Sequence, residues 1–240
     1  MDRILITGAT GGIGRAMVLT LAQAGYAVLA LGRNRAALAA LSAEAPGIEG
    51  IALDLADHAG LAEALAGRAI DVLVNNAGMM PRPGPFATME PEAIERTLAV
   101  NLADTLALTR LVLPGMLARG AGHVVFTGSS AAHAPGAGFA AYAASKAGIA
   151  AFATALRAEV SPFGLRVTEL VPGRVETGLY TGVLPEAARA AMYQDGHALQ
   201  PQDLADVLLA VLRLPARAAV TRLDLMPTRP VSPVSPVSLS

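Results

Sequence analysis

The chain has 240 residues, of which 53% are apolar, and a formal net charge of -1, which suits one large α/β domain and is too short for two with full cores. Its apolar runs are short and broken by Gly, Arg or Thr, and Asp2 and Arg3 lead straight into a strand-like segment, so we expect a cytoplasmic protein without membrane span or signal peptide. The lack of cysteine, of metal-ligand spacing among the four histidines and of a basic stripe argues against disulfides, a metal site and nucleic acid, and leaves small molecules as ligands.

Short runs of branched apolar residues alternate with helix-length, alanine-rich stretches along the whole chain. The runs are residues 3–7, 26–31, 48–53, 71–75, 123–128 and 165–171, with 219–226 as a possible seventh. Nearly continuous apolar strands that alternate with helices predict a doubly wound parallel sheet, here a single-domain α/β Rossmann-type fold of about seven strands over residues 1–228. Ligands of such sheets bind beyond the carboxyl ends of the strands, so we expect the functional residues at these strand ends.

The first strand ends in TGATGGIG, and an apolar helix is expected from residue 13 to 24. Gly8, Gly12 and Gly14 would let the backbone approach a pyrophosphate, and the N-terminus of the helix would offer unpaired N–H groups to it. The spacing departs from G-x-G-x-x-G, and a plain glycine-rich turn is the alternative.

The second and third strand ends carry charged residues that bear on the choice of cofactor. Arg33 follows the second strand, and no acidic residue lies between Arg3 and Ala43, which favours the 2′-phosphate of NADP over the free hydroxyl of NAD. Solvated arginines are the alternative. After the third strand, Asp54 and Leu55 could hold an adenine edge, although Asp54 could equally cap the next helix.

The fourth strand leads into NNAG, where the small Ala77 and Gly78 would let a flat ring pass close to the backbone and Asn75 could link strands through its amide. Alone, this motif could be a plain turn. In the helix expected over about residues 92–119, Asn101 interrupts an apolar stretch. Because asparagine is unfavourable inside a helix, Asn101 is either a satisfied buried amide, a surface residue or a kink around a bound water.

The chain holds one lysine, Lys146, beside 17 arginines. An ammonium group has a readily shifted pKa, whereas a guanidinium is permanently protonated. Tyr142 lies four residues earlier, on the same face of a helix. There the cation would lower the pKa of Tyr142 from about 10 and make the tyrosine a usable proton donor and acceptor. The alternative is an ordinary pair of neighbours on a helix surface.

Taken in order, these motifs resemble the short-chain dehydrogenase/reductase superfamily. TGATGGIG, the Asp54-Leu55 pair, NNAG, Asn101, Ser129, the Tyr142-x-x-x-Lys146 pair and PGRVET follow the order and spacing of that family over about residues 3–228. The segments QPQDLADVLLAVLRLP and AAVTRLDLMPT are most similar to NADP-dependent 3-hydroxy acid and serine dehydrogenases.

The resemblance implies a catalytic tetrad and a set of NADP contacts. Tyr142 would exchange the proton with the substrate oxygen, Ser129 (or Ser130) would orient that oxygen, and Lys146 would bind the nicotinamide ribose. Asn101 would hold a water that links Lys146 to solvent. The implied cofactor contacts are Gly8, Thr10, Gly12, Ile13, Gly14, Arg33, Asp54, Leu55, Asn75, Ala77, Gly78, Tyr142, Lys146, Pro172, Gly173, Val175 and Thr177. For Thr177, a simple helix cap is the alternative.

The resulting hypothesis is an NADP(H)-dependent oxidoreductase that acts on a small alcohol or carbonyl, and the alternative is a non-catalytic NADP(H) sensor. The expected substrate wall includes residues 79–81, Phe86, His133, Pro135, Phe139 and a segment over about 174–203. Arg82, Arg174 or Arg189 could bind a carboxylate there. The resemblance also implies a dimer or tetramer through the helices at 92–119 and 140–160. The PVSPVSPVS repeat within residues 229–240 predicts a low-complexity, weakly ordered tail.

Overall fold

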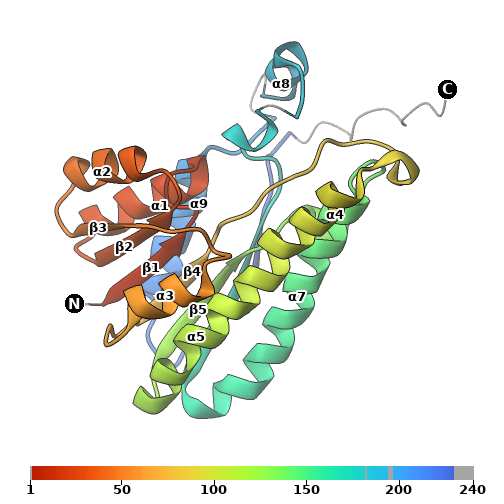
Figure 1. The fold of residues 1–240 in the computed structure, drawn as a ribbon. Coiled ribbons are helices and arrows are strands. Elements are labelled where there is room, and N and C mark those ends of the chain that lie inside the picture. The colour runs from red at the N-terminus through yellow and green to blue at the C-terminus, as the bar shows by residue number, and fades with distance from the viewer. Residues whose placement is uncertain (1, 182, 194–196, 230–240) are drawn as a thin grey trace.

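Strands far apart in the sequence pair into one parallel sheet in the order β3-β2-β1-β4-β5-β6-β7 (Figure 1). The structure is a computed structural model that describes residues 2–181, 183–193 and 197–229. Within these ranges the strands are β1 (Arg3–Thr7), β2 (Ala27–Gly32), β3 (Ile48–Ala52), β4 (Val72–Asn75), β5 (Gly122–Thr127), β6 (Leu165–Pro172) and β7 (Arg222–Leu225). The predicted Rossmann-type fold is confirmed, and the predicted seventh strand is present.

The strand order reverses at β1, which pairs with β2 on one side and with β4 on the other. The loops that follow β1 and β4 therefore turn toward opposite faces of the sheet and leave a crevice at the carboxyl ends of the two strands. The glycine turn emerges from β1 and NNAG from β4, so the fold brings these two motifs together at the crevice.

Helices cover both faces of the sheet, as Figure 1 shows. Ile4 and Ile6 pack in one core cluster with α1 (Gly12–Gln23), α2 (Arg35–Glu44) and α9 (Pro201–Leu212). Leu5, which points to the other face, packs in a second cluster with α3 (His58–Leu65), α5 (Asp104–Arg119) and α7 (Ala140–Val160). Because both faces are buried, the central strands are apolar at successive positions rather than at alternate ones.

The helix predicted over 92–119 has an irregular middle. It consists of α4 (Pro91–Leu98), the π-helical segment η2 (Ala99–Ala103) and α5, and it ends at Gly120, whose φ is 62°. Asn101 lies at the centre of η2 and is buried. π-Helical turns of this kind occur where a side chain is turned toward a functional site. The sequence thus marked the position of the irregularity.

The run Pro91–Arg119 corrects the expectation that no segment is long and apolar enough to span a membrane. Its 29 residues meet that test by length and composition. The runs looked short in the sequence because single polar residues interrupt them, and several of these residues are buried in the fold. Leu108, Val112 and Met116 of the same run pack in the core cluster beside β4 and β5, as expected for a core helix of an α/β protein.

The chain after β6 leaves the sheet before it returns as α9. It forms η4 (Gly178–Tyr180) and α8 (Glu186–Tyr193), which Figure 1 shows standing apart from the helical layers. A parallel bridge between Val175 and Leu199 ties the base of this segment together. The remaining short helices are η1 (Phe86–Thr88), α6 (Ser130–His133) and η3 (Ser161–Phe163). Except for Arg229, the predicted tail lies outside the described residues.

Candidate active site

A cavity of about 1680 Å³ follows the carboxyl ends of the strands. Pockets for a single small ligand are usually of about 300–1000 Å³, so this one has room for a dinucleotide and a substrate together. Its wall includes the glycine turn after β1, the loops after β2, β3, β4 and β5, one face of α7 and the segment after β6.

The glycine turn is built so that side chains cannot fill it. Gly8 has a φ of 64°, and a Cβ on Gly14 would lie 2.2 Å from the Gly8 carbonyl oxygen. At Gly12 a Cβ would approach the Thr177 side chain to 3.0 Å. Gly11 precedes α1 without a side-chain cap, so the first N–H groups of α1 face the cavity uncapped. Thr10 and Ile13 also line the cavity at this turn.

Charged residues lie at the ends of β2 and β3. Arg33 is largely exposed, and its Nη1 is 3.6 Å from Oδ2 of Asp54. Asp54 accepts a hydrogen bond from the amide of Ala56 at 3.1 Å, while the cap of α3 is Asp57, which accepts from the amide of Gly60 at 2.9 Å. The capping alternative for Asp54 is therefore wrong. Arg33, Asp54 and Leu55 all line the cavity.

The prediction for NNAG needs one correction. Asn75 belongs to β4, donates to Thr109 Oγ1 on α5 at 3.0 Å and is not part of the cavity wall. Asn76 takes the predicted linking role, because it donates to the carbonyl of Thr7 at 3.1 Å and accepts from Thr127 Oγ1 at 3.3 Å. Successive residues at a strand end point to opposite sides, and the motif does not show which asparagine faces the cavity.

Asn101 holds the loop that follows NNAG. Its Oδ1 accepts from the amide of Met79 at 2.8 Å, and its Nδ2 donates to the Met79 carbonyl at 2.9 Å and to Ser145 Oγ at 3.0 Å. A Cβ on Gly78 would lie 3.4 Å from Asn101 Oδ1 and 3.6 Å from Lys146 Nζ. The side chain thus connects the π-helical segment, the loop after β4 and α7. It is a satisfied buried amide and does not line the cavity.

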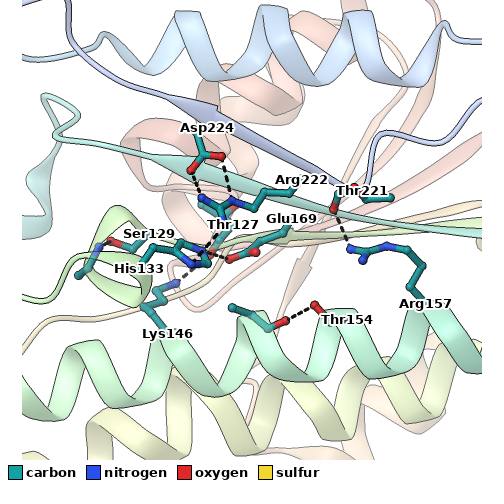
Figure 2. Close-up of polar contacts among 12 residues, drawn as sticks. Thr127, Ser129, His133, Lys146, Thr154, Arg157, Glu169, Thr221, Arg222 and Asp224 are labelled. Atoms are coloured by element: carbon teal, nitrogen blue, oxygen red, sulfur yellow. Dashed lines mark hydrogen bonds and ion pairs between the residues drawn. The ribbon is translucent and has the colours of Figure 1, made fainter.

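Ser129, Tyr142 and Lys146 meet in the cavity wall. Ser129 caps α6, and its Oγ accepts from the amide of Ala131 at 3.2 Å. Lys146 Nζ donates to the carbonyl of Thr127 at 2.8 Å (Figure 2) and lies 6.0 Å from the centre of the Tyr142 ring. The predicted pair on one face of a helix therefore lies in the cavity wall, beside the end of β5.

The charge states of this pair differ from the sequence expectation. Burial raises the pKa of Tyr142 to about 12, against a smaller lowering by hydrogen bonding to the Ser129 side chain. Burial also lowers the pKa of Lys146 to about 8, and the carboxylate of Glu169 opposes this. The expectation of a lowered tyrosine pKa is contradicted for this arrangement, because desolvation outweighs the hydrogen bond with Ser129. Ser129 and Ser130 both line the cavity, and of the two it is the Ser129 side chain that lowers the pKa of Tyr142.

The PGRVET motif lines the cavity through Pro172, Gly173, Val175 and Thr177. A Cβ on Gly173 would lie 2.8 Å from Met226 Sδ, so this turn is closely packed. Thr177 Oγ1 accepts from the amide of Leu179 at 3.2 Å, which makes Thr177 the cap of η4. Thr177 therefore caps η4 and also lines the cavity, so the capping alternative and the predicted cofactor contact are compatible.

The remaining wall is mainly apolar and includes Met79, Met80, Pro135, Phe139, Leu179 and Tyr180, whereas the predicted wall residues Pro81, Phe86 and His133 lie outside it. Among the candidate arginines, Arg174 lines the cavity and Arg82 and Arg189 do not. Arg96, an exposed residue of α4, also lines the cavity, and no motif in the sequence pointed to it.

Comparisons with known proteins agree with this geometry. A family model described as short chain dehydrogenase matches residues 2–187. A short-chain type dehydrogenase/reductase of Sinorhizobium fredii is 44% identical over 93% of this chain and 90% of its own length. The NADP-dependent 3-hydroxy acid dehydrogenase of Escherichia coli K12 is 34% identical over 93% of this chain and 94% of its own. The closed form of serine dehydrogenase complexed with NADP⁺ superposes with a TM-score of 0.91, at 32% identity, over 97% and 98% of the two chains.

Proposed function

The chain belongs to the short-chain dehydrogenase family of oxidoreductases, and on this premise we propose that it transfers a hydride between NADP(H) and a small alcohol or carbonyl substrate. The observation that carries the proposal is the meeting of Ser129, Tyr142 and Lys146 in the wall of a cavity that also contains an unfilled glycine turn. A protein that only sensed the dinucleotide would need the turn but no proton donor.

The residues present fit a dinucleotide. The glycines of the turn pack so closely against Ala77, Thr177 and one another that backbone, not side chains, lines this part of the cavity, and the uncapped N-terminus of α1 suits the negative charge of a pyrophosphate. Asp54 and Leu55 would border the adenine, and Pro172, Gly173, Val175 and Thr177 would border the nicotinamide. When bound, NADP(H) supplies or accepts the hydride.

Tyr142 is the proton donor of the proposed reduction. Because its pKa of about 12 keeps the hydroxyl protonated at neutral pH, it can donate to the carbonyl oxygen of a substrate. The Ser129 oxygen accepts from a backbone amide, which leaves its own hydrogen for the same carbonyl oxygen. Lys146 in its charged form would compensate the negative charge that remains on Tyr142, and Asn101 keeps the loop and helix around it in place.

NADP is favoured over NAD because of Arg33. This guanidinium lies exposed at the end of β2, and its contact with Asp54 is long at 3.6 Å. An exposed pair of that length contributes little to stability, so Arg33 can turn to a 2′-phosphate at low cost. Arginine binds phosphate oxygens in a fork of paired hydrogen bonds, which suits this role.

The substrate we propose is a short 3-oxo or 3-hydroxy acid that binds beside Arg174. Among the described residues of the wall, Asp54 is the one carboxylate, whereas Arg33, Arg96, Lys146 and Arg174 are basic. Arg174 is half-buried, and its Nη1 makes a long contact of 3.4 Å with the Met192 carbonyl, so it can reorient toward an anion. The names of the Escherichia coli relative and of the serine dehydrogenase also denote enzymes of hydroxy acids. The segment at about 174–203 would then form the substrate wall.

The first test measures binding and turnover in the same variants. NADPH and NADH are titrated by fluorescence, and NADPH consumption is then followed with 3-oxobutanoate. We expect Tyr142→Phe to bind NADPH as the wild type does and to lose turnover, and Tyr26→Phe, which removes a hydroxyl at the start of β2, to retain both. NADPH binding without turnover of 3-oxobutanoate or of short aldehydes by the wild type would favour the sensor.

The second test separates substrate charge from the carbonyl itself. The methyl ester of 3-oxobutanoate has the same ketone and no charge. We expect Arg174→Gln to raise KM for the acid by about tenfold to a hundredfold, the range of one charged hydrogen bond, and to leave KM for the ester unchanged. Arg96→Gln, at another arginine of the cavity wall, is the matched variant. Equal effects on acid and ester would refute the role of Arg174.

We also propose that the protein is a homo-oligomer that associates through the α4–α5 run and α7. These helices lie side by side on one outer face in Figure 1. Leu98 and Leu111 of the α4–α5 run are each 38% exposed and offer apolar surface to a partner. Light scattering after gel filtration should give a dimer or tetramer mass, and a monomer mass at micromolar concentration would refute the proposal.

A further inference from the structure

A chain of charged side chains runs from the edge strand β7 to Glu169, behind the cavity wall (Figure 2). Arg222 forms two hydrogen bonds with Asp224, of 2.8 Å and 2.7 Å, and its Nη1 is 3.4 Å from His133 Nδ1. His133 Nε2 is in turn 3.4 Å from Glu169 Oε1. None of Glu169, His133, Arg222 and Asp224 lines the cavity, and none has a part in the proposed hydride transfer.

Glu169 is the buried member of this chain. It is 3% exposed and lies in the middle of β6, where it pairs in register with Phe126 of β5 and with Arg222 of β7. A buried carboxylate is costly unless other groups compensate it. The Glu169 side chain fits here because residue 128 is a glycine, since a Cβ on Gly128 would lie 2.4 Å from Glu169 Oε1. The carboxylate thus lies against the backbone immediately before Ser129.

The chemistry of the side chains defines which group donates in each hydrogen bond of this chain. A guanidinium can only donate, so the contact of Arg222 with His133 requires an unprotonated Nδ1. The neutral ring then carries its hydrogen on Nε2 and donates it to Glu169. Asp224 holds Arg222 in the orientation that this requires. The arrangement gives the Glu169 carboxylate a hydrogen-bond donor and holds the Arg222 guanidinium beyond it.

Lys146 reaches the same short backbone segment as this carboxylate, because its Nζ donates to the carbonyl of Thr127 at 2.8 Å and the carboxylate lies against Gly128, the next residue. Lys146 lies on α7, which covers the face of the sheet toward which Glu169 points. Desolvation lowers the pKa of Lys146, and Glu169 is the charged residue that raises it. The other titratable group at Lys146 is Tyr142, on the same helix, and the groups that face Glu169 are Lys146, His133 and Arg222.

We propose that Glu169, oriented by His133 and Arg222, is a positioning residue that keeps Lys146 in its charged form and so sets the alkaline limit of the site. The consequence for turnover rests on the proposed function. The effect on the charge of Lys146 is independent of that function, because this charge can be measured in the protein without substrate. His133 and Arg222 link Glu169 to β7, the strand at the edge of the sheet.

The single lysine makes the measurement direct. Protein grown on ¹³C,¹⁵N-lysine gives one side-chain NMR signal, that of Lys146, and its chemical shift is followed from pH 6 to 11. We expect the wild type to titrate near pH 8 and Glu169→Gln to titrate about one pH unit lower, because an opposite charge nearby favours the charged form. The matched control is Glu49→Gln, the same change on β3 at the far edge of the sheet, which should not move the midpoint.

His133→Leu provides an independent arm that leaves Glu169 in place. Loss of the hydrogen bond from His133 should leave the Glu169 carboxylate less well oriented. The Lys146 midpoint should then fall by less than it does in Glu169→Gln. In the Glu169→Gln background the same change should have no further effect, which is the signature of residues that act through one another. If Glu169→Gln does not fold, His133→Leu carries the test. A Lys146 midpoint that is unchanged in either folded variant overturns the proposal.

The pH profile of turnover extends the test to catalysis. We expect the alkaline limb of kcat to move toward acid in Glu169→Gln by the same amount as the NMR midpoint, with kcat near pH 6 retained. A uniform loss of kcat at every pH would indicate a merely structural role and would overturn the positioning role. If no variant or wild type turns over any substrate, the proposed function fails, while the NMR arms still decide the role of Glu169.

Discussion

The buried His123 gives the structure a stability that depends on pH. His123 lies in β5 and is 1% exposed. Its Nε2 is 2.7 Å from Thr168 Oγ1, and Thr168 donates its own hydrogen to the Val220 carbonyl at 2.6 Å, so the imidazole must donate through Nε2. Its Nδ1 is buried and has no hydrogen-bond partner among the residues that the structure describes. Burial, with a smaller effect of Arg166, lowers the pKa of His123 to about 3.

The size of the effect follows from the two pKa values. Between pH 6.5 and 3 the unfolded chain binds a proton at His123 and the folded chain does not, so stability is fully present above pH 6.5 and is lost as pH falls. One pKa unit corresponds to about 1.4 kcal/mol, so His123 should cost about 2 kcal/mol at pH 5 and about 5 kcal/mol near pH 3.

Urea unfolding of the wild type and of His123→Val, at pH 7 and at pH 5, measures this contribution. Valine keeps a branched apolar residue in the strand and cannot titrate. Other groups titrate in both proteins and cancel in the comparison. We expect the wild type to lose about 2 kcal/mol more than the variant between the two pH values. An equal loss in both proteins would refute the account of His123.

Other predictions concern the turn and the strand ends. Gly14→Ala should lower the free energy of urea unfolding by about 1–3 kcal/mol, because its Cβ would meet the Gly8 carbonyl at 2.2 Å, whereas Gly11→Ala, with 3.5 Å to its nearest atom, should not. Asn76→Ala should cost about 1–3 kcal/mol in the same assay, because it removes hydrogen bonds that link strands β1 and β5. Arg33→Ala should raise the Kd for NADPH about tenfold to a hundredfold and leave that for NADH unchanged, as measured by fluorescence titration. Equal losses for both cofactors would contradict the reading of Arg33.

The fold could be predicted because its signals are local. Each strand is a short apolar run, each connection is of helix length, and the glycines indicate the turn after β1. Even the irregular helix was marked by Asn101, a polar residue where an apolar one is expected. The order of the strands, by contrast, was not predicted, because periodicity does not show which strands pair.

What the sequence could not provide depends on contacts between distant segments. The side on which Asn75 lies is set by the register of β4, and the burial that raises the pKa of Tyr142 is set by packing. Glu169 looked like one polar residue in an apolar strand until the structure brought it to Lys146 and His133. These residues are far apart in the sequence, so their contacts could not be predicted from it.

Direct transfer of deuterium from the cofactor to the product tests the central claim. The protein is incubated with 3-oxobutanoate and NADPH that carries deuterium at C4 of the nicotinamide, prepared separately for each face, and the product is examined by mass spectrometry. We expect 3-hydroxybutanoate that carries one deuterium at C3 from one of the two labelled cofactors, and none with Tyr142→Phe. Bound NADPH with no label transferred to 3-oxobutanoate or to any short aldehyde would contradict the assignment of a hydride-transferring site.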